Sequence, residues 1–139
     1  MEESAAYLDT NVFIYAAIKE DELGINSRRI LDLITIGKLV GFTSCLTFDE
    51  FIWIIRKIKP EMLAKAGSSL LDSNIKFADV NKLIIQNALD IMLEFNLKPR
   101  DAIHVATMKL NNIKIIISED SDFDKVNWIK RKGIMEFKL

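Results

Sequence analysis

The sequence has few of the residues that cross-link or interrupt a chain. Its single cysteine, Cys45, cannot form a disulfide within the chain, and the apolar-leaning stretch around it predicts a buried thiol in a reducing compartment. Only two prolines occur, and there is no repeat, low-complexity tract or Pro/Gly/Ser-rich linker that would mark a domain boundary. We therefore expect residues 1–139 to form a single domain.

An excess of one charge and long apolar runs are also missing. Nineteen basic and 20 acidic residues give a net charge of −1, which argues against a histone-like, nonspecific grip on nucleic acid. No run approaches the roughly 18 uninterrupted apolar residues that cross a bilayer. Residues 1–6 carry acids where a signal peptide has basic groups. The sequence thus predicts a cytoplasmic protein without a membrane segment.

Short apolar runs alternate with amphipathic, helical stretches. Strands are expected at residues 5–8, 39–43, 75–78 and 113–117, with a last strand near 135–139. Helices are expected at 12–19, 26–35, 48–58, 61–71, 80–95 and 100–110, the last of them opened by Pro99. This alternation predicts an α/β fold, a three-layer α/β/α sandwich with a central, mostly parallel sheet of about five strands.

Polar residues follow two of the expected strands at the point where each strand ends. Asp9, Thr10 and Asn11 follow residues 5–8, and the segment 118–122, which contains Ser118, follows residues 113–117. Ligands of open α/β sheets bind at the carboxyl ends of the strands. Glu50 and Asp101 fall in the first turns of two expected helices, so right-handed connections can bring these acids to the same edge.

Each acid also has a structural explanation, which is the commoner role when the acid is considered alone. Asp9 is a good N-cap, Thr47 and Glu50 fit a capping box, and Asp101 suits a first helical turn. Asp120 and Asp122 are typical turn residues. Gathered carboxylates nevertheless repel one another unless a cation neutralises them, and hard divalent cations such as Mg²⁺ and Mn²⁺ prefer oxygen ligands. The expected gathering of these acids at one edge therefore indicates a metal site.

Four blocks of the sequence resemble the PIN-domain nucleases over essentially the whole chain. The blocks are YLDTNV at residues 7–12, TFDEF at 47–51, RDAIHVA at 100–106 and SEDSDF at 118–123. In size the chain is similar to the VapC-type toxins of toxin–antitoxin pairs. The resemblance implies Mg²⁺ or Mn²⁺ bound by Asp9, Glu50, Asp101 and Asp120, with Asp122 as an optional fifth acid.

The neighbours of these acids receive different roles. Thr10, Asn11 and Ser118 are expected to orient the acids by hydrogen bonds, whereas Asp49 and Glu119 are left out because adjacent residues point elsewhere. His104, three residues after Asp101, is interpreted as a packed side chain and not as a general base. Trp53 could stack bases, but packing in the core is favoured because its helix is rich in large apolar residues.

The resemblance implies a metal-dependent ribonuclease that hydrolyses phosphodiester bonds with an activated water. Arg100 is a candidate RNA contact, and other basic side chains could follow the phosphates: Arg56, Lys57, Lys125, Lys130, Arg131 and Lys132. The resemblance also implies a small antitoxin partner and a homodimer. The alternative is a PIN-like module that binds metal and RNA or a protein without turnover. A haloacid-dehalogenase-type phosphatase is excluded because Asn11 stands where that motif has its second aspartate.

Overall fold

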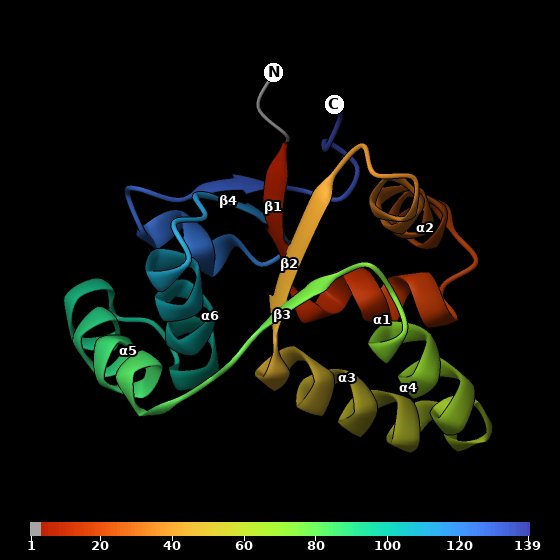
Figure 1. The fold of residues 1–139 in the computed structure, drawn as a ribbon, viewed down its shortest axis with the longest axis horizontal. Coiled ribbons are helices and arrows are strands. Elements are labelled where there is room, and N and C mark those ends of the chain that lie inside the picture. The colour runs from red at the N-terminus through yellow and green to blue at the C-terminus, as the bar shows by residue number, and fades with distance from the viewer. Residues whose placement is uncertain (1–3) are drawn as a thin grey trace.

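A parallel sheet of five strands forms the centre of the fold (Figure 1). The computed structural model describes residues 4–139, so the first half of the acidic segment 1–6 lies outside the described residues. The strands lie in the order β3-β2-β1-β4-β5 and all pair in parallel. Their bounds are β1 Ala5–Leu8, β2 Val40–Ser44, β3 Lys76–Ala78, β4 Ile115–Ile117 and β5 Lys130–Lys132. The predicted fold class is confirmed.

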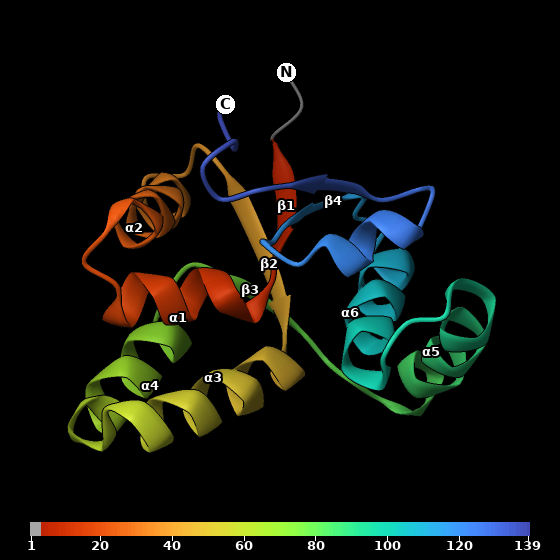
Figure 2. The same cartoon turned by 180° about the vertical axis from the view of Figure 1, so that it is seen from behind.

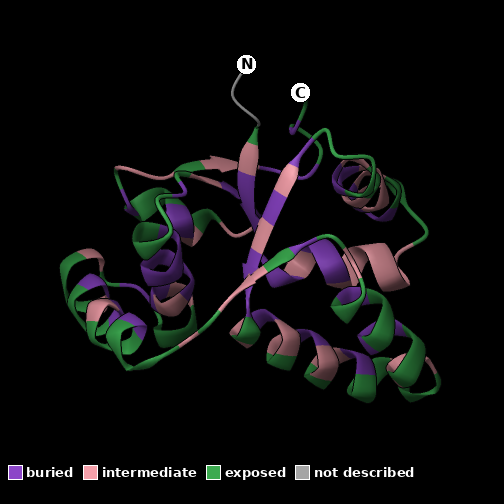
Figure 3. Ribbon diagram, in the orientation of Figure 1, coloured by how far each residue is buried: buried purple, intermediate pink, exposed green. Residues whose placement is uncertain are grey.

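Helices cover both faces of the sheet, as both views of the ribbon show (Figures 1 and 2). One face carries α1 Thr10–Ile18, α2 Glu22–Thr35, α3 Cys45–Ile58 and α4 Leu63–Leu71, and the other carries α5 Lys82–Phe95 and α6 Pro99–Leu110. An apolar core lies on each face of the sheet, and strand β1 contributes side chains to both. Ala6 and Leu8 point to the first face and Tyr7 points to the second. The strand is therefore buried from both sides, as its colour in Figure 3 shows.

Helix α3 begins earlier than the sequence predicted. The expected start was residue 48, but the helix begins at Cys45, directly after β2, with Ser44 at the N-cap. Its buried face includes Phe51 and Ile55, the apolar spacing seen in the sequence. The earlier start moves Glu50 from the first turn to the second, where a capping role is no longer available.

Two further predictions are wrong. The fifth strand is Lys130–Lys132 and not residues 135–139, because a charged tripeptide can form an edge strand whose side chains reach solvent. Cys45 is exposed and not buried. It occupies the first position of α3, where the chain leaves the sheet edge and turns its side chain away from the core.

None of the helices in the described part of the chain combines the length and the apolar character of a membrane span.

Candidate active site

The two central strands bring distant residues together at the carboxyl edge of the sheet. Strand β1 pairs with β4, with Leu8 opposite Ile117, so Asp9 and Ser118 follow at neighbouring positions. The Asp9 amide continues the pairing by donating to the Ile117 carbonyl at 3.1 Å. Residues 109 positions apart in the chain therefore meet at this edge.

Asp9 is the most enclosed of the candidate acids. Its Oδ1 accepts a hydrogen bond from the Thr10 amide at 2.8 Å, and its Oδ2 accepts one from Ser118 Oγ at 2.5 Å. Asn11 Nδ2 donates to the same Oδ2 at 3.4 Å. Burial raises the pKa of Asp9 even though these bonds and the nearby His104 oppose the rise. Asp9 thus N-caps α1, as predicted from the sequence, and also faces the site.

Glu50 is held by two groups from other elements. Its Oε1 accepts from Thr10 Oγ1 at 2.9 Å and lies 2.8 Å from His104 Nε2. The other ring nitrogen of His104, Nδ1, lies 2.6 Å from the Tyr7 hydroxyl oxygen. The capping-box interpretation is wrong, because Thr47 is the third residue of α3 and not its N-cap, and its Oγ1 accepts from Thr43 Oγ1.

Glu50 and His104 each favour the charged form of the other. Burial favours neutral Glu50, but the hydrogen bond and charge of His104 outweigh it and lower the pKa of Glu50. Burial also opposes a charged His104, yet the surrounding Tyr7 oxygen, Glu50 and Asp9 hold the pKa of His104 well above its ordinary value. His104 is a fully packed side chain, as the sequence predicted, but its contact with Glu50 was not foreseen.

Three other acids form a separate, more exposed group. Carboxylate oxygens of Asp101, Asp120 and Asp122 all lie within 4.8 Å of one another, and each residue is only partly buried. Burial and the neighbouring charges of Asp120 and Asp9 raise the pKa of Asp101 to about 6. Asp120 also serves as a turn residue, since its Oδ1 accepts from the Asp122 amide at 2.9 Å. The structural and site roles of these acids are compatible.

Both groups of acids border one depression of about 300 Å³. Its lining contains Asp9, Glu50, Asp101 and Asp120, and an adjoining depression of about 380 Å³ shares the last three and Arg100. Asp49 also lines the first depression, although it was expected to point elsewhere; the depression is broad enough to reach two successive residues of α3. The signal in the sequence was only its place beside Glu50.

Trp53 is a further correction. It is 61% exposed and lines the depression instead of packing in the core, because the buried face of α3 is already filled by Phe51 and Ile55. Among the basic candidates, Arg100 lies at the site. Arg131, in contrast, is held by both carboxylate oxygens of Asp124, at 2.9 and 3.1 Å.

The donor set fits a hard divalent cation. Ligands of one Mg²⁺ lie about 2.1 Å from the ion, so oxygens that already lie within 4.8 Å of one another can bind it after small side-chain rotations. Burial, followed by the charges of Asp120 and Asp9, raises the pKa of Asp101, and a bound cation would favour its ionised form. Asp101, Asp120 and Asp122 are the group that fits best.

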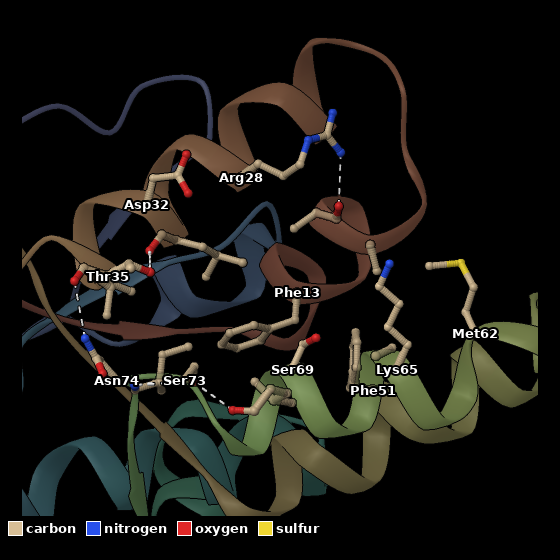
Figure 4. Close-up of a pocket in the computed structure, with 17 residues that line it drawn as sticks. Phe13, Arg28, Asp32, Thr35, Phe51, Met62, Lys65, Ser69, Ser73 and Asn74 are labelled. Carbon is tan, nitrogen blue, oxygen red and sulfur yellow. Dashed lines mark hydrogen bonds between the residues drawn. The ribbon is translucent and has the colours of Figure 1, made fainter.

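A second, apolar groove lies away from the acids, between α1, α2 and α4 (Figure 4). It has a volume of about 560 Å³ and a largely apolar floor that includes Phe13, Phe51 and Leu70. Arg28, Asp32 and Lys65 lie around it. Arg28 is fastened to the end of α1 by a 3.0 Å bond to the Ala16 carbonyl.

A parallel sheet with acids converging at its carboxyl edge defines a class of α/β domains suited to metal-assisted chemistry. The family description "PIN domain" matches residues 6–129, and the chain belongs to the PIN-domain family.

Several known proteins are similar to the chain. It is 24% identical to "Ribonuclease VapC2" of Methanocaldococcus jannaschii over 94% of each chain. The structure of Mycobacterium tuberculosis VapC20, described as a sarcin-ricin loop cleaving toxin, superposes with a TM-score of 0.73 at 18% identity, covering 91% of this chain and 97% of that one. A toxin–antitoxin complex from Klebsiella pneumoniae gives a TM-score of 0.70 at 19% identity, covering 90% and 95%. The chain resembles VapC toxins in sequence and fold.

Proposed function

We propose that the chain is a Mg²⁺- or Mn²⁺-dependent endoribonuclease whose catalytic acids are Asp9, Glu50, Asp101 and Asp120. The observation that carries the proposal is the convergence of these four acids on one depression at the carboxyl edge of the sheet. The PIN-domain match and the names of the relatives support RNA as the substrate class. Asp122 is the proposed fifth acid, because its carboxylate adjoins Asp101 and Asp120.

In such a site, some residues of the chain would hold the acids in place and another would contact the substrate. Ser118 and Thr10 fix the Asp9 carboxylate, and Thr10 with His104 fixes Glu50, so neither acid must be ordered when substrate binds. Asn11 supports Asp9 from the side. Arg100, exposed at the mouth, is placed to contact a phosphate oxygen.

The bound cation would supply positive charge to the phosphate and lower the pKa of an attacking water. Glu50 is the acid best kept ionised, since its pKa is lowered, and its carboxylate borders the depression, where it can orient a water by accepting a hydrogen bond. Because the attacking group is water and not the sugar 2′-hydroxyl, the products are expected to carry 5′-phosphate and 3′-hydroxyl ends.

Cleavage of RNA by the purified chain with Mg²⁺, Mn²⁺ or EDTA tests the proposal. We expect cleavage with either cation, none with EDTA, and a fall on the order of 10³-fold in a folded Asp101→Asn variant. Asp124→Asn is the matched control, because Asp124 is exposed and pairs with Arg131 outside the depression. Cyclic 2′,3′-phosphate products would contradict the mechanism, and metal binding without cleavage would favour the non-catalytic module instead.

We further propose that the chain is the toxin of a toxin–antitoxin pair and that the antitoxin occupies the apolar groove of Figure 4. The structural neighbour from Klebsiella pneumoniae is a toxin–antitoxin complex, which supports a partner of this kind. The apolar floor around Phe13 and Leu70, with Arg28, Asp32 and Lys65 at its sides, suits an amphipathic segment that carries charged residues at its margin. Co-expression with a candidate antitoxin, a small protein encoded beside this chain, should give a complex that Leu70→Asp disrupts; no complex with any such protein would contradict the proposal.

A homodimer is also proposed, on the family resemblance. The outer face of α5 exposes Ile85, Leu89 and Leu93, an apolar stripe at helical spacing. Sedimentation equilibrium should give a dimer for the wild type and a monomer for Leu89→Glu. An unchanged mass would exclude this face as the contact.

A further inference from the structure

Trp53 has an exposure that packing does not explain. It is the one exposed aromatic side chain of residues 4–139, at 61%, and it belongs to neither apolar core. Exposing an indole forgoes the burial of one of the largest apolar surfaces among the amino acids. A surface tryptophan of this kind is often an anchor for a binding partner.

The ring stands beside the acids. Trp53 lies one helical turn after Glu50 on α3 and lines the same depression, together with Ile14 and Ile54. It also lines a neighbouring hollow of about 490 Å³ formed with Arg56, Lys57 and Pro60. The indole therefore lines both the acidic depression and the basic hollow.

The two cations of the basic hollow form no ion pair with a carboxylate of the described residues. The Lys57 ammonium lies 5.1 Å from the centre of the Trp53 ring. Within the described residues neither Lys57 nor Arg56 has a carboxylate within 4.0 Å, whereas Arg131 and Lys125 do. Cations beside an exposed indole match a nucleotide, which offers a base to stack and a phosphate to neutralise.

We propose that Trp53 is the stacking platform for an unpaired base that flanks the scissile phosphate, and that Lys57 and Arg56 bind the adjoining phosphate. The inference rests on the proposed ribonuclease function. It specifies the form of RNA that the site binds. A base inside a duplex is already stacked on its neighbours, so the platform selects single-stranded segments. A protein partner could use the same tryptophan, but the two unpaired cations favour the polyanion.

Fluorescence of a single-tryptophan protein tests the inference without turnover. Trp128→Phe leaves Trp53 as the only reporter, and Asp101→Asn keeps the RNA intact. The probes are a short single-stranded oligoadenylate and its abasic counterpart, titrated with Mg²⁺ present. We expect the oligoadenylate to quench Trp53 emission and the abasic strand to leave it nearly unchanged.

Substitutions separate the ring from the charge. In a chain that retains Trp128 and binds a labelled RNA, Trp53→Leu should raise Kd about tenfold, whereas Trp53→Phe retains most of the affinity. Lys57→Gln should reduce the slope of log Kd against log salt by about 0.7 for each phosphate that the protein no longer neutralises. Lys38→Gln, an exposed change before the amino end of β2, is the matched control and should change nothing.

The outcomes distinguish this inference from the proposed function. Equal affinity of the wild type and Trp53→Leu, or equal quenching by the abasic strand, would overturn the platform even if the Asp101-intact chain cleaves RNA. Quenching by RNA without any cleavage would support the platform and defeat the ribonuclease. A Trp53→Leu variant that loses a protein partner but binds RNA normally would assign the ring to that partner and overturn the inference.

Discussion

The candidate site has two halves whose acids differ in their hydrogen-bond partners. In the inner half, Asp9 and Glu50 receive hydrogen bonds from hydroxyl, amide and imidazole groups of the chain. In the outer half, Asp101 adjoins Asp120 and Asp122, and its pKa rises to about 6 because the carboxylates are partly desolvated and repel one another. The inner acids thus have several hydrogen-bond donors from the chain, although burial still raises the pKa of Asp9. Among the described residues, the cation that lies within 4.0 Å of an outer acid is Lys125, 3.7 Å from Asp122 Oδ1.

Asp101→Asn should give the largest effect on activity. It should remove a carboxylate from the outer half and leave the hydrogen bonds of the inner half in place. We expect metal-dependent cleavage to fall by on the order of 10³-fold, since the variant lacks a group that positions transition-state charge. Kinetics of cleavage at saturating Mg²⁺ measure the fall. Retention of more than a tenth of the activity would remove Asp101 from the catalytic set.

His104→Leu should produce the largest loss of stability and should break the inner half. It leaves Glu50 and the Tyr7 hydroxyl without their partner, which we expect to cost about 2–3 kcal/mol. Urea unfolding measures the cost. Asp122→Asn, in the outer half, is the comparison and should leave the free energy of unfolding nearly unchanged or slightly higher.

Ser118→Ala should have a smaller effect that links the halves through Asp9. Without the 2.5 Å hydrogen bond, the Asp9 carboxylate is harder to ionise and less well oriented. We expect metal affinity or activity to fall about 10-fold, measured by metal-dependent cleavage, with Ser121→Ala as the exposed control. An unchanged activity would show that Asp9 is positioned without Ser118.

The pH dependence of metal-free stability should show the smallest effect. Folded Asp101 keeps its proton up to about pH 6, whereas the unfolded chain loses it near 3.8, so stability attributed to this group falls as the pH rises between those values. After discounting for solvent exposure, Asp101→Asn should gain up to about 1 kcal/mol at pH 8 in EDTA. Urea unfolding at pH 4 and pH 8 tests this; an equal effect at both would contradict the raised pKa.

The sequence was sufficient for the sheet but not for every side chain. The apolar runs of β1 and β4 and the acids after them were visible because both strands are buried on two faces. The last strand was misplaced because Lys130–Lys132 has no apolar pattern and takes its place by pairing with β4. Edge strands are specified by their neighbour more than by their own residues.

The sequence predicted that the four acids meet at one edge of the sheet, and they line one depression there, but it did not predict their hydrogen bonds. Glu50 was assigned to a cap because Thr47-x-x-Glu50 fits a local motif, while its partners Thr10 and His104 lie 40 and 54 residues away. Trp53 was assigned to the core because large residues dominate its helix, although only one face can be buried. Such long-range choices depend on which face of a helix meets the sheet.

The pairing of β1 with β4 has a consequence for how the protein is made. Asp9 emerges from the ribosome early, but Ser118, which holds it, and Asp120 follow only near the end of synthesis. A nascent or prematurely terminated chain therefore has the first acid without its counterpart strand. The site can therefore be complete only after synthesis has reached the last quarter of the chain.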